Sequence, residues 1–324
     1  MGAERRTIEQ AHELVREGRV VAAVGALEQA GAAGDAAALI ELAAWYMRGA
    51  IVPRSLARSR EFFGLAAEQG DTQARMIYAS LVGNGTGGPR DWPVAIGLLE
   101  AMADDSGDAA RQLALIRAMR LTDDGEPNTL PVRRTVSERP EVAWFGELLT
   151  HDECNYLIAT AEPLLKPSVV VDPHTGGHVP HPIRTSDGAA FPWASEVPAV
   201  HALNRRLAAA SATDERCGEP LQILRYRPGQ QYRSHHDAVA DDNQRIITML
   251  VYLNADFAGG ETAFIGSDLK LRGKVGDALW FRNADAEGRP DPSARHAGLP
   301  VTAGEKLIAS RWIRQRPFGP DRLI

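Results

Sequence analysis

One stretch of the sequence, LQILRYRPGQQYRSHHD, combines a strand-like pattern with two histidines and an acid. It covers residues 221–237. Apolar and polar side chains alternate as far as Tyr226, a Pro-Gly pair interrupts the pattern, and His235, His236 and Asp237 end it. In an extended segment, residues two apart lie on the same face. We therefore expect the side chains of His235 and Asp237 to converge and that of His236 to point away.

A further histidine with a lysine behind it follows about sixty residues later. His296 precedes a hydrophobic, strand-like run from Lys306 to Trp312. Two imidazoles and one carboxylate on one face of a metal suit non-haem Fe(II) and leave positions open for substrate and oxygen. Lys306 lies ten residues after His296, across an apparent turn at Ala303-Gly304. An antiparallel return would bring its ammonium group back towards the metal.

Several motifs at this spacing resemble the prolyl 4-hydroxylase branch of the Fe(II)/2-oxoglutarate dioxygenases. They are YxxGQxYxxHxD at 226–237, GGET at 259–262, GDALWF at 276–281 and HxGxPVxxGxK at 296–306. The likeness extends upstream to FGELLTHDECNYLI and IRTS, and downstream to Trp312-Ile313-Arg314, so it covers roughly Pro140 to Pro317. A lone HxD motif would be a weak signal, whereas this ordered set at the family spacing is specific.

The resemblance implies an oxidoreductase that hydroxylates an unactivated C–H bond while 2-oxoglutarate is decarboxylated to succinate. His235, Asp237 and His296 match the Fe(II) ligands, and they form the implied catalytic centre. Neutral imidazoles and an ionised carboxylate together hold such a metal without saturating it. The implied cofactors are Fe(II), 2-oxoglutarate and O2, with ascorbate (vitamin C) as a further one.

Other matched positions imply contacts with the co-substrate and the substrate. Lys306 would pair with the distal carboxylate of 2-oxoglutarate, where many related branches use Arg, and a buried cavity would strengthen that charge-assisted contact. Tyr226 and Thr262 would add hydroxyl hydrogen bonds. Arg184 and Trp280 are candidates for lining the substrate pocket, against the alternatives of a structural arginine and a core tryptophan. The Gly/Pro-rich segment 171–183 corresponds to a mobile loop that closes over substrate in the resembling family.

Composition restricts the partners and the setting. The net charge of −6 argues against nucleic acid or an anionic membrane as the main partner, since both favour a basic face. Two cysteines are too few for a disulfide framework and fit a reducing compartment. The N-terminus is not signal-like, and no apolar run is long enough to span a membrane. We expect a cytoplasmic protein.

The first third of the chain carries a helical repeat. Gly-Asp pairs recur at Gly34, Gly70 and Gly107, at intervals of 36 and 37 residues, within a sequence rich in Ala, Leu and Glu. Such a period, with two helices per unit, is typical of a helical solenoid. The segments 41–52 and 59–71 resemble the Sel-like class of tetratricopeptide-type repeats. A stack of this kind either presents a concave surface to a partner peptide or only stabilises its neighbour.

The expected architecture is α + β and multidomain. Residues 1–125 form the helical repeat domain, 126–140 a linker with an edge strand at its end, and 141–324 the catalytic domain. In the last, helices over 150–164 and 196–210 accompany a double-stranded β-helix, a jelly-roll or cupin-like barrel. The expected strands are 168–171, 221–226, 246–253, 263–264, 269–271, 277–280 and 306–312.

Three functions fit these observations. The first is a peptidyl hydroxylase, most simply a prolyl one, whose repeats recruit a protein or peptide. The second is a hydroxylase of a free amino acid or natural-product intermediate. The third, from another class, is a repeat adaptor whose barrel senses 2-oxoglutarate or iron without turnover. The complete ligand set and Lys306 count against the third.

Overall fold

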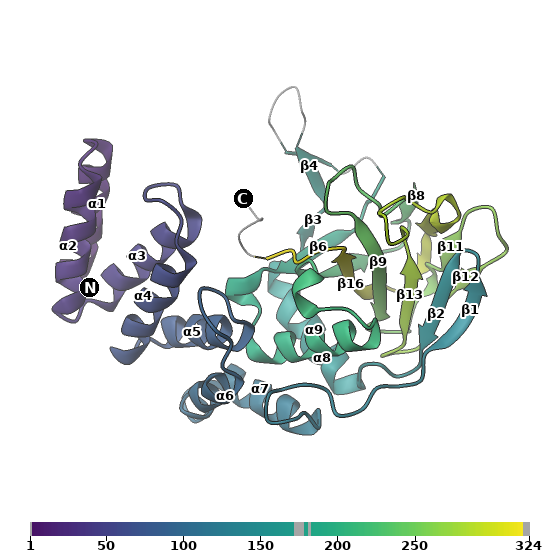
Figure 1. The fold of residues 1–324 in the computed structure, drawn as a ribbon, viewed down its shortest axis with the longest axis horizontal. Helices are drawn as coiled ribbons and strands as arrows, with labels where there is room; N and C mark the ends of the chain where they lie inside the picture. The colour runs from purple at the N-terminus through teal and green to yellow at the C-terminus, as the bar shows by residue number, and fades with distance from the viewer. Residues whose placement is uncertain (1, 172–177, 181–182, 320–324) are drawn as a thin grey trace. The chain divides into compact units, whose positions relative to one another are not determined.

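The computed structural model describes residues 2–171, 178–180 and 183–319, and it divides into two compact units (Figure 1). The first unit contains the residues up to Glu126 together with Trp193–Ala202. The second contains the described residues of 127–192 and of 203–319. The boundaries at 125 and 140 expected from the sequence stay predictions. The structure adds residues 193–202 to the helical unit.

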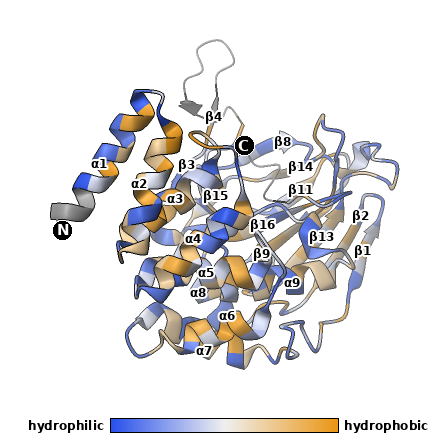
Figure 2. Cartoon of the chain, turned by 60° about the vertical axis from the view of Figure 1, so that its left-hand side comes forward, coloured by the Kyte–Doolittle hydropathy of each residue, from blue (hydrophilic) through white to orange (hydrophobic). Residues whose placement is uncertain are grey.

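Seven consecutive helices make up most of the described part of the first unit, and each packs against the next along the chain. They are α1 (Gly2–Arg16), α2 (Val20–Ala32), α3 (Ala36–Arg48), α4 (Leu56–Glu68), α5 (Thr72–Asn84), α6 (Trp92–Glu100) and α7 (Gly107–Ala118). The buried faces of α1 to α5 share a core that includes Leu27, Leu42 and Phe62. In Figure 2 these helices carry apolar and polar residues side by side, as expected for helices that bury one face.

The Gly-Asp pairs mark helix boundaries. Gly34 and Gly70 have φ of 98° and 92°, a left-handed conformation that costs glycine little, and each ends a helix. The following Asp35 and Asp71 are N-caps whose carboxylates accept hydrogen bonds from the backbone of the next helix. The third pair differs, because Ser106 caps α7 and Gly107 is its first residue. The aspartate of the Gly-Asp pair therefore caps a helix in the first two pairs but not in the third.

Residues 193–202 have their partners within the helical unit. Asn84 Nδ2 donates to the carbonyl of Trp193 at 2.8 Å, and the backbone N–H of Ala199 donates to Gln112 Oε1 at 3.4 Å. His201 and Glu196 form a buried pair with Nδ1 and Oε1 2.7 Å apart. This segment holds η2 (Trp193–Ser195) and the beginning of α9 (Pro198–Ala210).

The second unit is built mainly from antiparallel strands. Its helical elements besides α9 are α8 (His151–Ala161), η1 (Glu162–Leu164), η3 (Glu215–Cys217) and η4 (Pro292–Ala294). Its strands are β1 (Arg134–Glu138), β2 (Glu141–Phe145), β3 (Lys166–Pro167), β4 (Val169–Val171), β5 (His178–Pro180), β6 (Asp187–Phe191), β7 (Leu221–Tyr226), β8 (Tyr232–His235), β9 (Arg245–Tyr252), β10 (Ala258–Gly259), β11 (Thr262–Phe264), β12 (Lys270–Leu271), β13 (Ala278–Arg282), β14 (His296–Gly298), β15 (Val301–Ala303) and β16 (Lys306–Arg314).

Two sheets carry the site. The larger has the strand order β1-β2-β13-β9-β16-β7-β6-β3, and the smaller has β12-β11-β14-β8. Apolar side chains from both pack together, among them Leu224 and Phe281 of the larger sheet and Phe264 of the smaller. The predicted double-stranded β-helix is confirmed, and β7 has the predicted bounds. Of the strands not named from the sequence, β6 pairs with β7 and β14 pairs with β8.

The predicted helix over residues 150–164 is present as α8 followed by η1. Thr150 is its N-cap, and a capping box forms because the Thr150 side chain bonds the Glu153 backbone and the Glu153 side chain bonds the Thr150 backbone. Arg206 of α9 donates to Glu153 at 2.6 Å, which joins the two helices by a buried ion pair. None of the described helices is both long and apolar enough to cross a membrane.

Candidate active site

Two neighbouring strands of the smaller sheet bring two histidines and an aspartate together. His296 on β14 pairs directly with His235 on β8, and Asp237 follows the end of β8. The ligand atoms of the three side chains all lie within 4.8 Å of one another, and all three are buried. His235 Nε2 lies 3.5 Å from Asp237 Oδ1, and His296 Nε2 lies 3.7 Å from Asp237 Oδ2. We call this cluster the metal end.

The backbone selects the tautomer that each ring takes in its neutral form. His235 Nδ1 is 2.8 Å from the carbonyl of Arg233, and His296 Nδ1 is 3.0 Å from the carbonyl of Ala294. A carbonyl oxygen can only accept, so each Nδ1 must carry the hydrogen and donate it. Each neutral ring then has an unprotonated Nε2, and both Nε2 atoms lie near Asp237. This is the tautomer that a metal ligand requires.

The charges at the metal end suit a cation. Burial favours the neutral form of Asp237, but His296, His235 and the hydrogen bond from Thr248 outweigh it and hold the pKa well below its usual range. Burial lowers the pKa of His296 to about 4, against the opposing effect of Asp237. At neutral pH the cluster therefore presents an ionised Asp237 and a neutral His296, and together with the His235 ring this donor set fits Fe(II).

His236, between two residues of the cluster, lies outside it. Its Nε2 donates to the carbonyl of Asp291 at 2.6 Å, and its Nδ1 accepts from the backbone of Ala238 at 3.3 Å. Its tautomer is therefore opposite to that of His235. Strand alternation predicts this separation.

Lys306, the first residue of β16, is buried beside Tyr226 of β7, its partner in the sheet. Its Nζ donates to the carbonyl of Gly260 at 2.6 Å and lies 5.7 Å from the centre of the Tyr226 ring. Burial lowers the pKa of Lys306 to about 8, although Glu261 acts in the opposite direction. Within the described part of the chain, no carboxylate lies within ion-pair distance of Nζ. Thr262, two residues after Gly260, lines a cavity together with Tyr226 and Lys306. We call these three lining residues the lysine end.

A single cavity joins the two ends. It is lined by Leu224, Tyr226, Tyr232, His235, Asp237, Leu250, Thr262, His296, Gly298, Leu299, Lys306, Ile308, Ser310 and Trp312. Four of these alternate along β16, from Lys306 to Trp312, because residues two apart share a face of the strand. Burial raises the pKa of Tyr226, so its hydroxyl is neutral and available as a hydrogen-bond donor.

Arg184 and Trp280, the two candidates for substrate contacts, have different surroundings. Arg184 is half-buried and pairs with Tyr232, whose ring centre lies 5.6 Å from the Arg184 guanidinium and which lines the cavity. Trp280 lies on the opposite face of β13 from Phe281. The guanidinium of Arg133 is 4.6 Å from the centre of the Trp280 ring. Phe281 contacts His296 instead, with ring centres 4.6 Å apart. The structure does not bring Trp280 to the cavity. The expected mobile loop over 171–183 lies largely outside the described residues.

Two cavity residues without an assigned role in the sequence interpretation stand out, and Arg245 packs against one of them. Tyr232 stacks on His235 with ring centres 3.5 Å apart. Trp312 lines the cavity, and the guanidinium of Arg245 lies 4.2 Å from the centre of its ring. Trp312 was within reach of prediction, because it lies six residues after Lys306 on the same strand. Arg245 gives no comparable signal.

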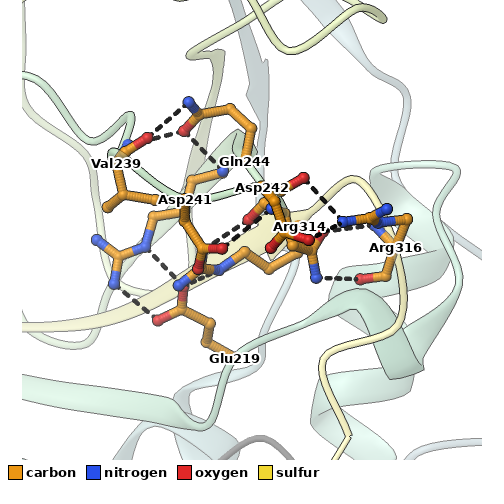
Figure 3. A network of polar contacts seen from close by, with 9 residues as sticks. Glu219, Val239, Asp241, Asp242, Gln244, Arg314 and Arg316 are labelled. Carbon is orange, nitrogen blue, oxygen red and sulfur yellow. Dashed lines mark hydrogen bonds and ion pairs between the residues drawn. The ribbon is translucent and has the colours of Figure 1, made fainter.

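A network of ion pairs and hydrogen bonds around Glu219 and Arg314 holds the loop that precedes β9 (Figure 3). Arg245 donates to both oxygens of Glu219 at 2.6 and 2.7 Å. Arg314 donates to the same Glu219 at 2.5 Å and to Asp241 at 3.0 Å. Gln244 adds two hydrogen bonds to the backbone of Val239, of 2.7 and 2.8 Å. The loop between Asp237 and β9 is thus fixed at several points beside the metal end.

Comparison with known proteins shows which family has this arrangement. Residues 221–314, which contain the metal end and the lysine end, match the family model of the 2OG-Fe(II) oxygenase superfamily. Prolyl 4-hydroxylase 1 of Arabidopsis thaliana is 37% identical over 201 residues, 56% of this chain and 71% of that protein. Probable prolyl 4-hydroxylase 10 of the same plant is 30% identical over 253 residues, covering 69% of this chain and 87% of that protein.

Among solved structures, a viral collagen prolyl hydroxylase from Paramecium bursaria Chlorella virus-1, in complex with 2OG, aligns with a TM-score of 0.43 and 30% identity, over 53% of this chain and 95% of that one. The sequence relatives and the matched domain are sufficient for the assignment. The chain belongs to the 2OG-Fe(II) oxygenase superfamily, and it is an oxidoreductase that depends on Fe(II), 2-oxoglutarate and O2.

Proposed function

We propose that this chain hydroxylates prolyl residues in a protein or peptide. The observation that carries the proposal is one cavity with a cation site at its metal end and a buried, unneutralised lysine at the other. The relatives named prolyl 4-hydroxylases support the prolyl substrate.

In this proposal, His235, Asp237 and His296 hold Fe(II). Their unprotonated nitrogens and the ionised carboxylate fit the metal, and three ligands leave positions open. The bound iron, with 2-oxoglutarate and O2, supplies the oxidising power that turns C–H into C–OH, while 2-oxoglutarate becomes succinate and CO2. The buried surroundings exclude water from this position, since Phe264 and Phe281 both pack against His296.

The lysine end receives the distal carboxylate of 2-oxoglutarate. Lys306 carries a buried charge with no carboxylate within reach among the described residues, so an incoming anion compensates its burial. The Tyr226 hydroxyl donates to the same group, and so does Thr262, whose hydroxyl lies 3.4 Å from that of Tyr252. These contacts orient the co-substrate along the cavity towards the metal end.

Trp312 and Arg245 form the wall that the substrate meets. Trp312 shares a cavity face with Lys306, and its buried Nε1 has no hydrogen-bond partner among the described residues. The Glu219 carboxylate fixes Arg245 against the ring. A flat, apolar surface backed by a rigid cation suits a prolyl ring and its backbone carbonyl.

The test begins with the co-substrate. Fe(II) and then 2-oxoglutarate are added to the protein without oxygen, and the visible charge-transfer band of the chelate is recorded. A band in the wild type that is absent in His296→Ala supports the metal and co-substrate assignments. A folded, metal-loaded protein without a band contradicts them.

The substrate is tested next. Prolyl peptides of varied flanking sequence and free proline are offered with O2, and products are identified by mass spectrometry and by succinate release. Hydroxylation of peptides but not of free proline supports the proposal. Turnover of free proline alone would replace it with an amino-acid hydroxylase.

We further propose that the helical unit recruits the substrate protein. Its exposed aliphatic side chains include Val21, 89% exposed, Leu65 and Val94. Deleting residues 1–125 would remove the partners of residues 193–202, so point variants are the cleaner test. Val21→Glu and Leu65→Glu should raise KM for a protein substrate and leave a short peptide unaffected. If both variants have the wild-type KM for the protein substrate, the repeats have only a structural role.

Three further expectations remain proposals. Ascorbate would keep the iron ferrous between turnovers, which a dependence of activity on ascorbate would test. The charge of −6 supports a partner that is neither nucleic acid nor membrane. The composition supports a cytoplasmic location, which fractionation would test.

A further inference from the structure

Two buried side chains outside the cavity form a chain of hydrogen bonds that ends on Asp237. Thr248 Oγ1 lies 2.6 Å from Asp237 Oδ2, and Asn283 Nδ2 lies 2.8 Å from Thr248 Oγ1. Thr248 and Asn283 are fully buried, and Asp237 is 4% exposed. Neither Thr248 nor Asn283 belongs to the motifs that resemble the family.

The two hydrogen bonds run in one direction, from Asn283 through Thr248 to Asp237. Asn283 Nδ2 can only donate, so it occupies a lone pair of the Thr248 oxygen. The single hydroxyl hydrogen of Thr248 is then directed to Asp237, and the 2.6 Å distance is that of a hydrogen bond to an ionised carboxylate. Asp237 Oδ2 receives this bond, while Oδ1 is the oxygen nearer to His235.

The backbone holds both donors rigidly. Thr248 lies within β9, paired with Phe281 of β13 on one side and with Trp312 of β16 on the other. Asn283 follows β13, its N–H donates to the carbonyl of Ile246 at 2.8 Å, and its carbonyl accepts from Asp291 at 2.8 Å. The Asp237 carboxylate is thus tied to the larger sheet, whereas both histidines lie on the smaller one.

We propose that Thr248 and Asn283 are positioning residues that hold Asp237 in one rotamer, with Oδ2 bonded to Thr248 and Oδ1 left for the metal. The inference rests on the proposed role of Asp237 as a ligand. Outer partners of this kind typically contribute 10–100-fold to metal affinity, because they fix the orientation of the ligand before the metal arrives. Thr248 would do for Asp237 what the carbonyls of Arg233 and Ala294 do for the histidines.

The experiment measures metal binding without turnover. Co(II) is titrated into full-length protein, and its dissociation constant and visible d–d spectrum are recorded. Thr248→Val keeps the shape of the side chain but removes the donor, and it should raise the Co(II) dissociation constant by about 10–100-fold and alter the spectrum. Thr248→Ser restores the hydroxyl and should return both to near wild type. Asn283→Ala leaves the hydroxyl free to rotate, and its effect should be smaller than that of Thr248→Val.

A matched control separates positioning from loss of structure. Ser211 is also buried, and its hydroxyl donates to Leu207 of α9 and to no candidate ligand. Ser211→Ala should bind Co(II) as the wild type does. If Thr248→Val does not fold, the Thr248→Ser and Asn283→Ala variants still decide.

The outcomes are distinct. Wild-type affinity and spectrum in Thr248→Val, or in Asn283→Ala where Val does not fold, would overturn the positioning role and leave the proposed function intact. Failure of Thr248→Ser to restore the site would also overturn it. A wild-type protein that binds no Co(II) would overturn both.

Discussion

The two ends of the cavity are prepared for their ligands in different ways. At the metal end, each ligand side chain has a hydrogen-bond partner that fixes its orientation, and the carboxylate is ionised. At the lysine end, Lys306 donates to one carbonyl among the described residues, that of Gly260, and burial lowers the pKa of its ammonium group to about 8. The metal end is rigid and suited to bind a cation, while the lysine end is positively charged and suited to bind an anion.

This difference predicts how each end fails. A ligand removed from the metal end takes away the metal and therefore all turnover. A change at the lysine end weakens one contact to the co-substrate, and saturating 2-oxoglutarate compensates for it. The contrast gives a graded series of effects, from loss of the site to a small change in one hydrogen bond.

The largest effect is expected for His296→Ala. Losing a direct ligand should abolish turnover and raise the metal dissociation constant by more than the roughly 10–100-fold that an outer partner contributes. Metal content, Co(II) titration and succinate release measure this. His236→Ala is the adjacent control, since its nitrogens bond Asp291 and Ala238. Equal metal loss in both variants would contradict the separation of the two histidines.

The next effect is expected for Lys306→Met, which keeps most of the side-chain volume and removes the charge. A hydrogen bond to a charged group contributes about 1.5–3 kcal/mol, so the dissociation constant of 2-oxoglutarate should rise by about 10–150-fold. Metal affinity should be unchanged, because Lys306 belongs to the other end. The charge-transfer band, titrated with 2-oxoglutarate, measures the shift; an unchanged midpoint would remove Lys306 from the site.

How far the sequence predicts this site depends on how local the signal is. Strand alternation suffices for the separation of His235 from His236, and β7 has its predicted bounds, although the adjacent Ile223 and Leu224 are both buried and interrupt its alternation. Along β13 the residues from Ala278 to Phe281 are all buried, so no alternation shows which face Trp280 takes. Its place is decided by the pairing of β13 with β2 and β9.

The partners of the ligands are harder to predict. Thr248 lies 11 residues from Asp237 and Asn283 lies 35 residues beyond Thr248, and no motif connects them. They meet only because the register of β9 and β13 aligns them.

The third Gly-Asp pair departs from the repeat for a local reason. Ser106 is itself a good N-cap, so α7 begins two residues earlier than the pattern indicates.

The lysine end also predicts a pH dependence of co-substrate binding. In the free protein the pKa of Lys306 is about 8, below the 10.5 of an unburied lysine. Below pH 8 the side chain is charged, and the affinity for 2-oxoglutarate should be flat with respect to this group. Above pH 8 the association constant should fall by up to about tenfold per pH unit, because binding must first restore the proton.

A substitution separates this effect from other titrations. Lys306→Arg remains charged over the whole range and should lose the decline above pH 8, even if its affinity is lower. The free energy of unfolding of the wild type should rise, and not fall, with pH over this range. The unfolded chain keeps the proton up to about pH 10.5, so the cost of burying the charge falls as the pH rises from 8 to 10.5.

The smallest effect is expected for Tyr226→Phe. The ring remains packed beside Lys306, its partner across the sheet, and only the neutral hydroxyl is lost. A neutral hydrogen bond contributes about 0.5–1.5 kcal/mol, so the dissociation constant of 2-oxoglutarate should rise by about 2–12-fold, with metal affinity unchanged. A rise as large as that of Lys306→Met would mean that the hydroxyl, and not the ammonium group, is the principal contact at the lysine end. The graded order His296, Lys306, Tyr226 therefore tests whether the two ends differ as their hydrogen bonds and charges indicate.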